Sequence, residues 1–302
     1  MRALIISGGG SKGAFAGGVA QYLIEDLHKQ YDLFLGTSTG SLLVSHLALN
    51  KVAKIKEAYT SVTPKSIFSN CPFKIKKRFG EEIIGFHHFN IVKNFIRGKN
   101  TFGESHNLRK LIRDFFSKEE FEKLKESPKD IVVTVSNLSL NTVEYKSIND
   151  FEYDDFCDWI WISCNYIPFM SLVRKNGCDY ADGGFAAQVP IEEAIKRGAT
   201  HVDAIILETE NNLYNRLPAR GAFSALTNLF AFMMDRIEYQ NIKIGKYEAT
   251  LKNATINFYY TPTLLTTNSL IFKKEQMKKW WQSGYEYAKT KDVDSQEILP
   301  EE

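Results

Sequence analysis

A five-residue segment near the N-terminus places the strongest constraint on the fold of this chain. Gly36-Thr37-Ser38-Thr39-Gly40 has the form G-x-S-x-G, in which a serine occupies a sharp turn between a strand and a helix. The flanking residues predict an apolar strand over 31–35 and a buried helix over 41–49. Gly36 and Gly40 lack a Cβ, so the two elements can pack closely around a strained serine. The segment predicts a nucleophilic serine, and the alternative is a plain glycine turn with a capping serine.

A second glycine cluster lies upstream of the serine. Residues 3–7 predict a buried strand, Gly8-Gly9-Gly10-Ser11-Lys12-Gly13 follows, and a helix is predicted over residues 14–29. Consecutive glycines at the start of a helix let backbone N–H groups converge on an anion. In acyl transfer that anion is the oxyanion of the tetrahedral intermediate. Lys12 adds a positive charge that suits either this oxyanion or a phosphate.

The same cluster also fits a dinucleotide-binding fingerprint. Gly8, Gly10 and Gly13 spell G-x-G-x-x-G after a strand. That motif needs an acidic residue at the end of the second strand, whereas Asp32 opens the predicted strand. A dinucleotide site would also leave the serine turn unexplained, so it is the weaker hypothesis. No Walker A motif occurs in the chain.

A third segment supplies a carboxylate on a glycine-rich turn. Asp182-Gly183-Gly184 precedes a predicted helix over 191–197 and a predicted strand over 202–207. Because open α/β sheets bind ligands at the carboxyl ends of their strands, we expect Asp182 at the same edge of a parallel sheet as Ser38. A serine hydroxyl needs a base within hydrogen-bond reach, and burial makes a carboxylate a better base. The segments predict a Ser–Asp dyad.

In this order and spacing, the three segments resemble those of the patatin-like phospholipase family over about residues 1–210. The resemblance implies a three-layer α/β/α fold with a mainly parallel central sheet, followed by C-terminal helices. It also implies that Ser38 is the nucleophile and Asp182 its base. The implied oxyanion hole comprises Gly8, Gly9, Gly10, Ser11, Lys12 and Gly13, with the amides of Gly9 and Gly10 as the best candidates. Strands are expected near residues 3–7, 31–35, 131–136, 142–146 and 202–207.

Ser163-Cys164-Asn165-Tyr166-Ile167-Pro168 resembles the A-S-x-A-x-P segment that precedes the aspartate in this family. Ile162 and Asn165 stand where small residues are usual, which affects the shape of the pocket more than its chemistry. The implied activity is hydrolysis of acyl esters of glycerophospholipids through an acyl-enzyme, with no metal or other cofactor. An inactive or gated lipid-binding protein is the alternative from another class.

The histidines offer a second mechanism. Ser38, Asp182 and His201 follow the chain order of an α/β-hydrolase triad. His201 begins a predicted strand, where a surface position is typical, so the dyad is preferred.

The other histidines have structural interpretations. His46 lies on the helix after the serine, and His28 and His106 look like solvated helix positions. His87-His88 would need a third ligand at a recognised spacing to bind a metal, and none stands there.

At 302 residues, the chain is long enough to bury a large core as one domain with appendages. We expect a catalytic domain over residues 1–210 and a helical extension over 211–302 that packs on it. The four cysteines show no C-x-x-C spacing and are most simply buried thiols in a reducing compartment. The N-terminal apolar run is too short for a signal peptide. No apolar run in the sequence reaches the roughly 18 residues that are needed to cross a bilayer. These features predict a cytoplasmic protein that contacts membranes from the side.

Residues 73–99 combine basic and aromatic side chains within an insertion over about residues 60–125 that suits a lid. The mixture is typical of contact with an anionic lipid surface. The alternative is a helical excursion whose aromatic residues form a local core. The basic residues are Lys74, Lys76, Lys77, Arg78, Lys93, Arg97 and Lys99.

The C-terminal segments leave several interpretations open. Residues 273–281 pair lysines with Trp280 and Trp281, which suits either a membrane interface or a helix anchored on the domain. Residues 223–237 predict an apolar helix that packs on the sheet, lines an acyl-chain pocket or forms a homo-oligomer contact. The tail from Lys291 is acidic and predicted to be disordered. A net charge of +2 and the lack of a recognised module argue against nucleic-acid binding.

Overall fold

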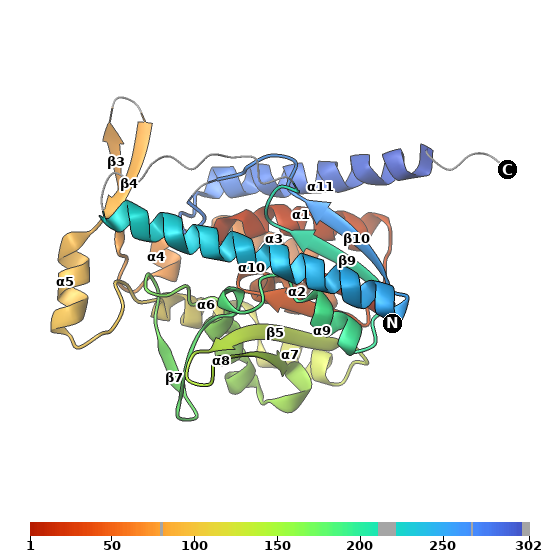
Figure 1. Ribbon diagram of the computed structural model, residues 1–302, viewed down its shortest axis with the longest axis horizontal. Coiled ribbons are helices and arrows are strands. Elements are labelled where there is room, and N and C mark those ends of the chain that lie inside the picture. The colour runs from red at the N-terminus through yellow and green to blue at the C-terminus, as the bar shows by residue number, and fades with distance from the viewer. Residues whose placement is uncertain (79–80, 211–221, 267, 298–302) are drawn as a thin grey trace.

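The computed structural model describes residues 1–78, 81–210, 222–266 and 268–297. A mixed sheet of eight strands runs through the molecule in the order β10-β9-β1-β2-β5-β8-β7, and β6 also pairs with β5 (Figure 1). The parallel strands are β1 (Arg2–Ile6), β2 (Leu33–Thr37), β5 (Asp130–Asn137), β9 (His201–Ile206) and β10 (Thr255–Tyr260). The antiparallel strands are β6 (Thr142–Ser147), β7 (Val173–Lys175) and β8 (Cys178–Asp182). The predicted α/β fold with a mainly parallel sheet is confirmed.

Each face of the sheet has its own apolar core, because side chains alternate along a strand. On β1, Leu4 and Ile6 enter one core while Ala3 and Ile5 enter the other. The first core is covered by α1 (Gly13–Gln21), α2 (Thr39–Ala48), α3 (Val52–Ser61), α6 (His106–Phe115), α7 (Lys118–Lys125), α8 (Tyr153–Ser163) and α11 (Lys274–Glu297). The second is covered by α9 (Ile191–Lys196) and α10 (Ala222–Lys252) (Figure 1). The three-layer arrangement is therefore confirmed.

The paired tryptophans anchor the C-terminal helix on the domain. Trp281 is fully buried in the core beside α1, and its indole N–H donates to Oε1 of Gln21 at 2.8 Å. Trp280 is also buried. The prediction of an anchored helix over residues 273–281 is confirmed, and a membrane interface for these two side chains is wrong.

The insertion after α3 is mixed in structure. It holds α4 (Pro64–Ile67), an antiparallel hairpin of β3 (Phe73–Arg78) and β4 (Glu81–Phe86), and α5 (His88–Ile96). The hairpin and α5 project from one end of the molecule (Figure 1). The helical excursion expected around residues 73–99 is thus wrong for its first half, where residues 73–86 form the two paired strands.

The other departures from prediction are local. The helix expected over residues 14–29 ends as a π-helical turn, η2 (Tyr22–Asp26), while η1 (Gly10–Lys12) precedes α1. Two further short turns are η3 (Ile148–Asp150) and η4 (Gly183–Phe185). Strands β7, β8 and β10 were not predicted, and β10 adds an edge strand to a C-terminal region expected to be helical. The apolar helix predicted over residues 223–237 is the first half of α10. Within the described ranges, no helix is both long and apolar enough to span a membrane.

Candidate active site

Ser38 occupies a strained turn between β2 and α2. Its φ of 52° and ψ of −117° place it in a region that side-chain-bearing residues rarely adopt. The turn also needs glycine at position 40, because a Cβ there would lie 2.2 Å from the carbonyl oxygen of Ile6 on β1. Gly36 meets the same restriction, since its Cβ would lie 2.4 Å from the carbonyl carbon of Gly40. These contacts explain the glycine spacing of the serine motif.

Asp182 reaches the serine by a route that differs from the predicted one. β8, which ends at Asp182, runs antiparallel to β5. β6 pairs with one edge of β5 along residues 132–137 of β5. The other edge of β5 is therefore shared by two strands: β2 pairs along residues 130–134 and β8 along residues 135–137. The carboxyl ends of β2 and β8 therefore meet head to head. The expectation that Asp182 ends a parallel strand is wrong, although its place beside Ser38 is as predicted.

The two side chains form a short hydrogen bond. The Ser38 hydroxyl donates to Oδ2 of Asp182 at 2.6 Å, and the Gly184 amide donates to Oδ1 at 2.8 Å. Asp182 is only 2 % exposed, and this burial raises its pKa to about 7, although both hydrogen bonds act in the opposite direction. The carboxylate is thus a stronger base than an exposed aspartate, and it is directed at one hydroxyl.

A network of hydroxyl groups holds the backbone of the serine turn. The Ser38 amide donates to Oγ of Ser163 at 3.0 Å, and Ser163 lies 2.8 Å from the hydroxyl of Ser41. Ser41 in turn donates to the carbonyl of Gly36 at 2.9 Å. The backbone carbonyl of Asn165 accepts a hydrogen bond from the Asp182 amide at 2.9 Å. The segment over residues 163–168 therefore contacts both the serine turn and the aspartate strand.

Four amides of the glycine loop over residues 8–13 donate to described residues, and two do not. Those of Gly9 and Gly10 have no acceptor among the described residues. The other four amides of the loop donate to backbone carbonyls of the protein. The donor and acceptor pairs are Gly8 to Gln188, Ser11 to Ser269, Lys12 to Gly9, and Gly13 to both Gly10 and Ser11. Gly10 has a φ of 55°, and a Cβ there would lie 2.3 Å from the carbonyl oxygen of Ser269. Position 10 therefore requires glycine.

Two residues that the sequence analysis missed hold this loop in place. Gln188 is 8 % exposed, and its Nε2 donates to the carbonyl of Gly8 at 3.0 Å. Its Oε1 has no donor among the described residues. The Tyr59 hydroxyl donates to the carbonyl of Gly10 and also contacts Oγ1 of Thr39, the residue after the serine. Gln188 follows Asp182 by six positions, which is the only sequence signal that could have drawn attention to it.

Lys12 does not face the serine. Its side chain is buried and its amine forms an ion pair with Glu208, just after β9. Glu238 on α10 is also buried, and this burial raises its pKa to about 8, with the charge of Glu208 adding to the effect. The alternative role of Lys12 as a phosphate ligand has no support from this geometry.

The competing site hypotheses place their residues elsewhere. His201 is exposed at the amino end of β9, where its ring lies 3.1 Å from Oγ1 of Thr200, so the histidine triad is wrong. Asp32 precedes β2 and accepts the amide of Arg2 at 2.8 Å, at the end of the sheet opposite the glycine loop, so the dinucleotide site is wrong as well. His46 is buried and bonds the carbonyl of Phe115 at 3.0 Å. No group of three or more potential metal ligands occurs within the described parts of the chain.

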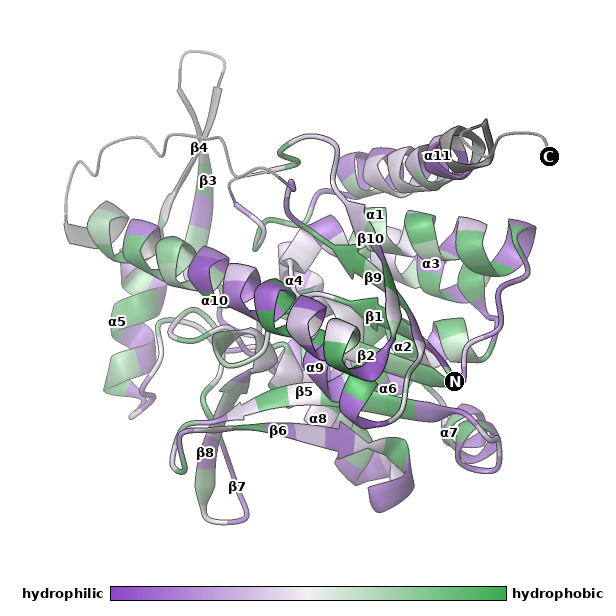
Figure 2. Cartoon of the chain, turned by 45° about the vertical axis from the view of Figure 1, so that its right-hand side comes forward, coloured by the Kyte–Doolittle hydropathy of each residue, from purple (hydrophilic) through white to green (hydrophobic). Residues whose placement is uncertain are grey.

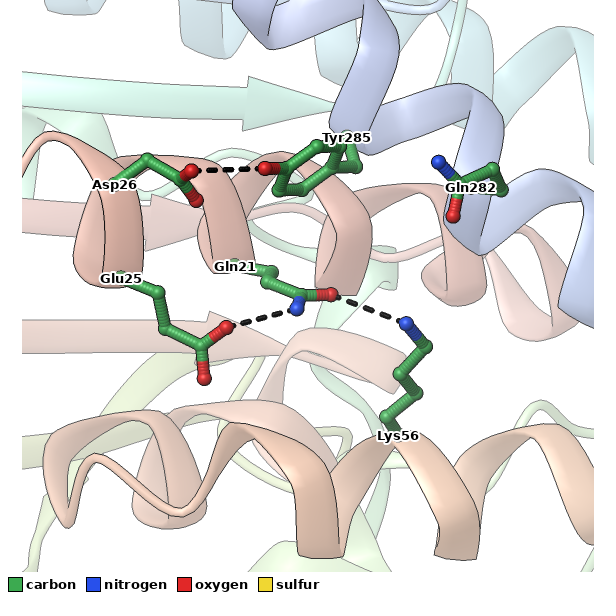
Figure 3. Close-up of a pocket in the computed structure, with 6 residues that line it drawn as sticks. All are labelled: Gln21, Glu25, Asp26, Lys56, Gln282 and Tyr285. Atoms are coloured by element: carbon green, nitrogen blue, oxygen red, sulfur yellow. Dashed lines mark hydrogen bonds between the residues drawn. The ribbon is translucent and has the colours of Figure 1, made fainter.

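A polar hollow of about 330 Å³ lies apart from these residues, between η2, α3 and α11 (Figure 3). Its polar groups bond to one another: Gln21 to Glu25, Lys56 to Gln21, and Tyr285 to Asp26. The hollow shares no residue with the serine site, and its side chains join the N-terminal and C-terminal helices.

The structure thus combines a mainly parallel α/β sheet with a strained serine that is hydrogen-bonded to a buried aspartate. The family model described as patatin-like phospholipase matches residues 4–195, more than half of the chain. The chain therefore belongs to the patatin-like phospholipase family, and its general class is that of lipid hydrolases. Its fold is similar to the crystal structure of VipD from Legionella pneumophila, with a TM-score of 0.53 and 15% identity over 97% of this chain and 67% of that one. No curated protein matches the chain by sequence.

Proposed function

We propose that this protein hydrolyses acyl esters of glycerophospholipids, with Ser38 as the nucleophile and Asp182 as its base. The observation that carries the proposal is the 2.6 Å hydrogen bond from the Ser38 hydroxyl to a carboxylate buried beside it. A carboxylate in direct contact with the hydroxyl can take its proton without a histidine between them.

The chemistry needs only groups that this chain supplies. As Oγ of Ser38 attacks the ester carbonyl carbon, its proton passes to Oδ2 of Asp182. The carbonyl oxygen becomes an oxyanion and accepts hydrogen bonds from the amides of Gly9 and Gly10. Asp182 then protonates the leaving alcohol, and an acyl-enzyme remains on Ser38. Water, deprotonated by Asp182, attacks the acyl carbonyl, and the proton returns to Oγ as the fatty acid leaves.

The supporting residues suit this role for the glycine loop. Each missing oxyanion donor typically raises the barrier by about 3 kcal/mol, so the position of the loop matters to the rate. Gln188 holds the carbonyl of Gly8, which belongs to the same peptide unit as the unpaired Gly9 amide. Tyr59 holds the carbonyl of Gly10, in the peptide unit that follows the unpaired Gly10 amide. Contact with an anionic membrane surface and a cytoplasmic location remain part of the proposal.

Intact mass after treatment with a fluorophosphonate probe tests the proposal. Wild type should gain one adduct, and Ser38→Ala should gain none. Ser61→Ala is the matched control, because Ser61 is exposed and its hydroxyl bonds, among the described residues, only the carbonyl of Ala58. An unlabelled but folded wild-type protein would contradict the proposal and favour the inactive lipid-binding alternative.

A further inference from the structure

Helix α5 directs four of its five apolar side chains outward, and Ile91 is the one that is buried. Phe89 is 72 % exposed and Ile96 81 % exposed, and Val92 and Phe95 on the same helix are exposed as well. Globular proteins normally turn the apolar stripe of a helix toward the core. Contiguous exposed apolar side chains mark a surface that another body covers.

The inner side of α5 is held largely by amide groups. Nδ2 of Asn90 donates to the carbonyl of Cys71 at 2.9 Å, and Nδ2 of Asn94 donates to the carbonyl of Thr101 at 2.9 Å. Asn70 donates to the backbone of Asn90 at 3.1 Å. These directional bonds fix how the helix sits on the domain, so its exposed apolar face is part of the folded arrangement.

The first turns of α10 present a second apolar group at the same end of the molecule (Figures 1 and 2). Leu229, Phe232 and Met233 are each about half exposed, with exposed fractions of 54 %, 58 % and 47 %. Phe230 on the same helix turns inward and contacts Phe185 with a ring separation of 6.4 Å. We call the exposed side chains of α5 and of these turns the apolar end face.

A row of aromatic rings joins this end face to the aspartate turn. Phe95 of α5 contacts Phe102 at 6.0 Å, Phe102 contacts Phe169 at 6.0 Å, and Phe169 stacks on Tyr166 at 6.0 Å. Tyr166 stacks on Phe185 at 5.0 Å, and Phe185 directly follows Asp182-Gly183-Gly184. The apolar end face and the Ser38 site are therefore connected by continuous apolar packing.

The charged side chains of α5 and of the residues just after it are basic, although Lys99 lies 4.0 Å from a carboxylate oxygen of Glu104. Residues 87–99 contain no acidic side chain, while Lys93, Arg97 and Lys99 are all exposed. Lys93 and Arg97 form no ion pair with any described residue. Each basic side chain near an anionic bilayer contributes to binding, and exposed aromatic and aliphatic residues suit the boundary between headgroups and acyl chains.

We propose that the apolar end face docks on an anionic phospholipid bilayer, with the outer side of α5 and the first turns of α10 at the membrane interface and Lys93 and Arg97 on lipid phosphates. This inference rests on the proposed function, because it names the surface that brings the ester to Ser38. The basic flank favours an anionic bilayer over a second copy of this chain, whose own α5 carries the same positive charge.

Vesicle sedimentation with Phe89→Asp combined with Ile96→Asp tests the docking. These positions are seven residues apart and share one helix face. With vesicles of phosphatidylcholine and phosphatidylserine, the double variant should bind about tenfold more weakly than wild type or worse, because two apolar anchors are lost. The control is Tyr247→Asp combined with Leu251→Asp, an exposed aromatic and aliphatic pair near the other end of α10, which should bind like wild type. Lys93→Gln should weaken binding about fivefold, and only when phosphatidylserine is present.

Turnover of a soluble ester separates this inference from the proposed function. The α5 double variant should keep wild-type turnover of a soluble ester while its hydrolysis of vesicle phospholipid falls with binding. Three results would contradict the proposed docking surface. They are a wild-type protein that does not bind the vesicles, an α5 variant that binds them like wild type, and a wild-type dimer that the α5 substitutions dissociate. A wild type that binds vesicles through α5 but turns over no ester would instead overturn the proposed function alone.

Discussion

The hydroxyl oxygen of Ser38 lies 2.6 Å from a carboxylate oxygen of Asp182, although 144 positions separate the two residues in the chain. Two strands that share one edge of β5 bring them together from opposite directions. The carboxylate is buried and the serine backbone is strained, so both residues are held at a cost in stability. Strain and buried charge of this kind are typical of functional sites.

The rate of ester hydrolysis should rise with pH through about 7. Burial raises the pKa of Asp182 to about 7, and only its deprotonated form can accept the serine proton. Below that pKa, kcat/KM should fall about tenfold per pH unit. The measurement is a pH profile with a soluble ester whose own ionisation lies outside the range. A flat profile between pH 5 and 8 would contradict a base of this kind.

Asp182→Asn should stabilise the fold while removing turnover. A carboxyl whose pKa is higher in the folded than in the unfolded state binds more protons when folded, so wild-type stability falls as pH rises from about 4 to about 7. The asparagine lacks this charge, and the variant should gain about 4 kcal/mol over wild type at pH 8 and almost nothing at pH 4. Urea unfolding at both pH values measures the difference, and an equal effect at each would argue against a buried ionised carboxylate.

Gly40→Ala should destabilise the protein by about 3 kcal/mol, because its methyl group would collide with the backbone of β1. Gly85→Ala is the matched control. A Cβ at position 85 would have no atom within 4 Å, so that change should stay within about 0.5 kcal/mol. Thermal melts of the two variants give the comparison. A neutral Gly40→Ala would mean that the serine turn can relax away from Ile6.

Gln188→Glu should slow catalysis without unfolding the protein. The substitution keeps the shape of the side chain but removes the N–H that holds the carbonyl of Gly8. We expect kcat to fall about tenfold to a hundredfold with little change in KM, since the oxyanion donors act mainly in the transition state. Fluorophosphonate labelling should slow by a similar factor, and the melting temperature should fall by a few degrees because a buried carboxyl group then faces the carbonyl of Gly8 without a donor. A rise in KM with kcat unchanged would indicate instead that Gln188 helps to bind the substrate.

His201→Ala should retain most of the wild-type activity. In the register of β9, β1 and β2, His201 stands level with Arg2, whereas Ser38 follows the opposite end of β2, roughly 20 Å away along the strands. Steady-state turnover of a soluble ester is the test. A loss of a hundredfold or more would show that the sheet register does not hold in solution.

Local patterns in the sequence were sufficient to predict the turns that carry Ser38 and Asp182. Gly36 and Gly40 flank Ser38 in a five-residue pattern that can be recognised from sequence alone. The contact that excludes a Cβ at position 40, with Ile6 on β1, is visible only in the structure. The strands over residues 3–7 and 202–207 were also predictable, because buried parallel strands are short apolar runs. The strand, glycine turn and helix around residues 8–13 were predicted by the same kind of local argument, whereas the choice of the Gly9 and Gly10 amides came from the family resemblance and stays a prediction.

Contacts between distant segments decided the rest. Neither the antiparallel direction of β8 nor its shared edge with β2 follows from the residues around Asp182, since strand pairing depends on the whole sheet. The ion pair of Lys12 with Glu208 and the hydrogen bond of Gln188 to Gly8 join residues about 180 positions or more apart. The outward apolar face of α5 depends on the hydrogen bonds that Asn90 and Asn94 donate to the carbonyls of Cys71 and Thr101, outside the helix. The sequence by itself determined which residues could react, whereas burial and strand pairing, which exist only in the folded chain, decided which of them meet and what each one can do.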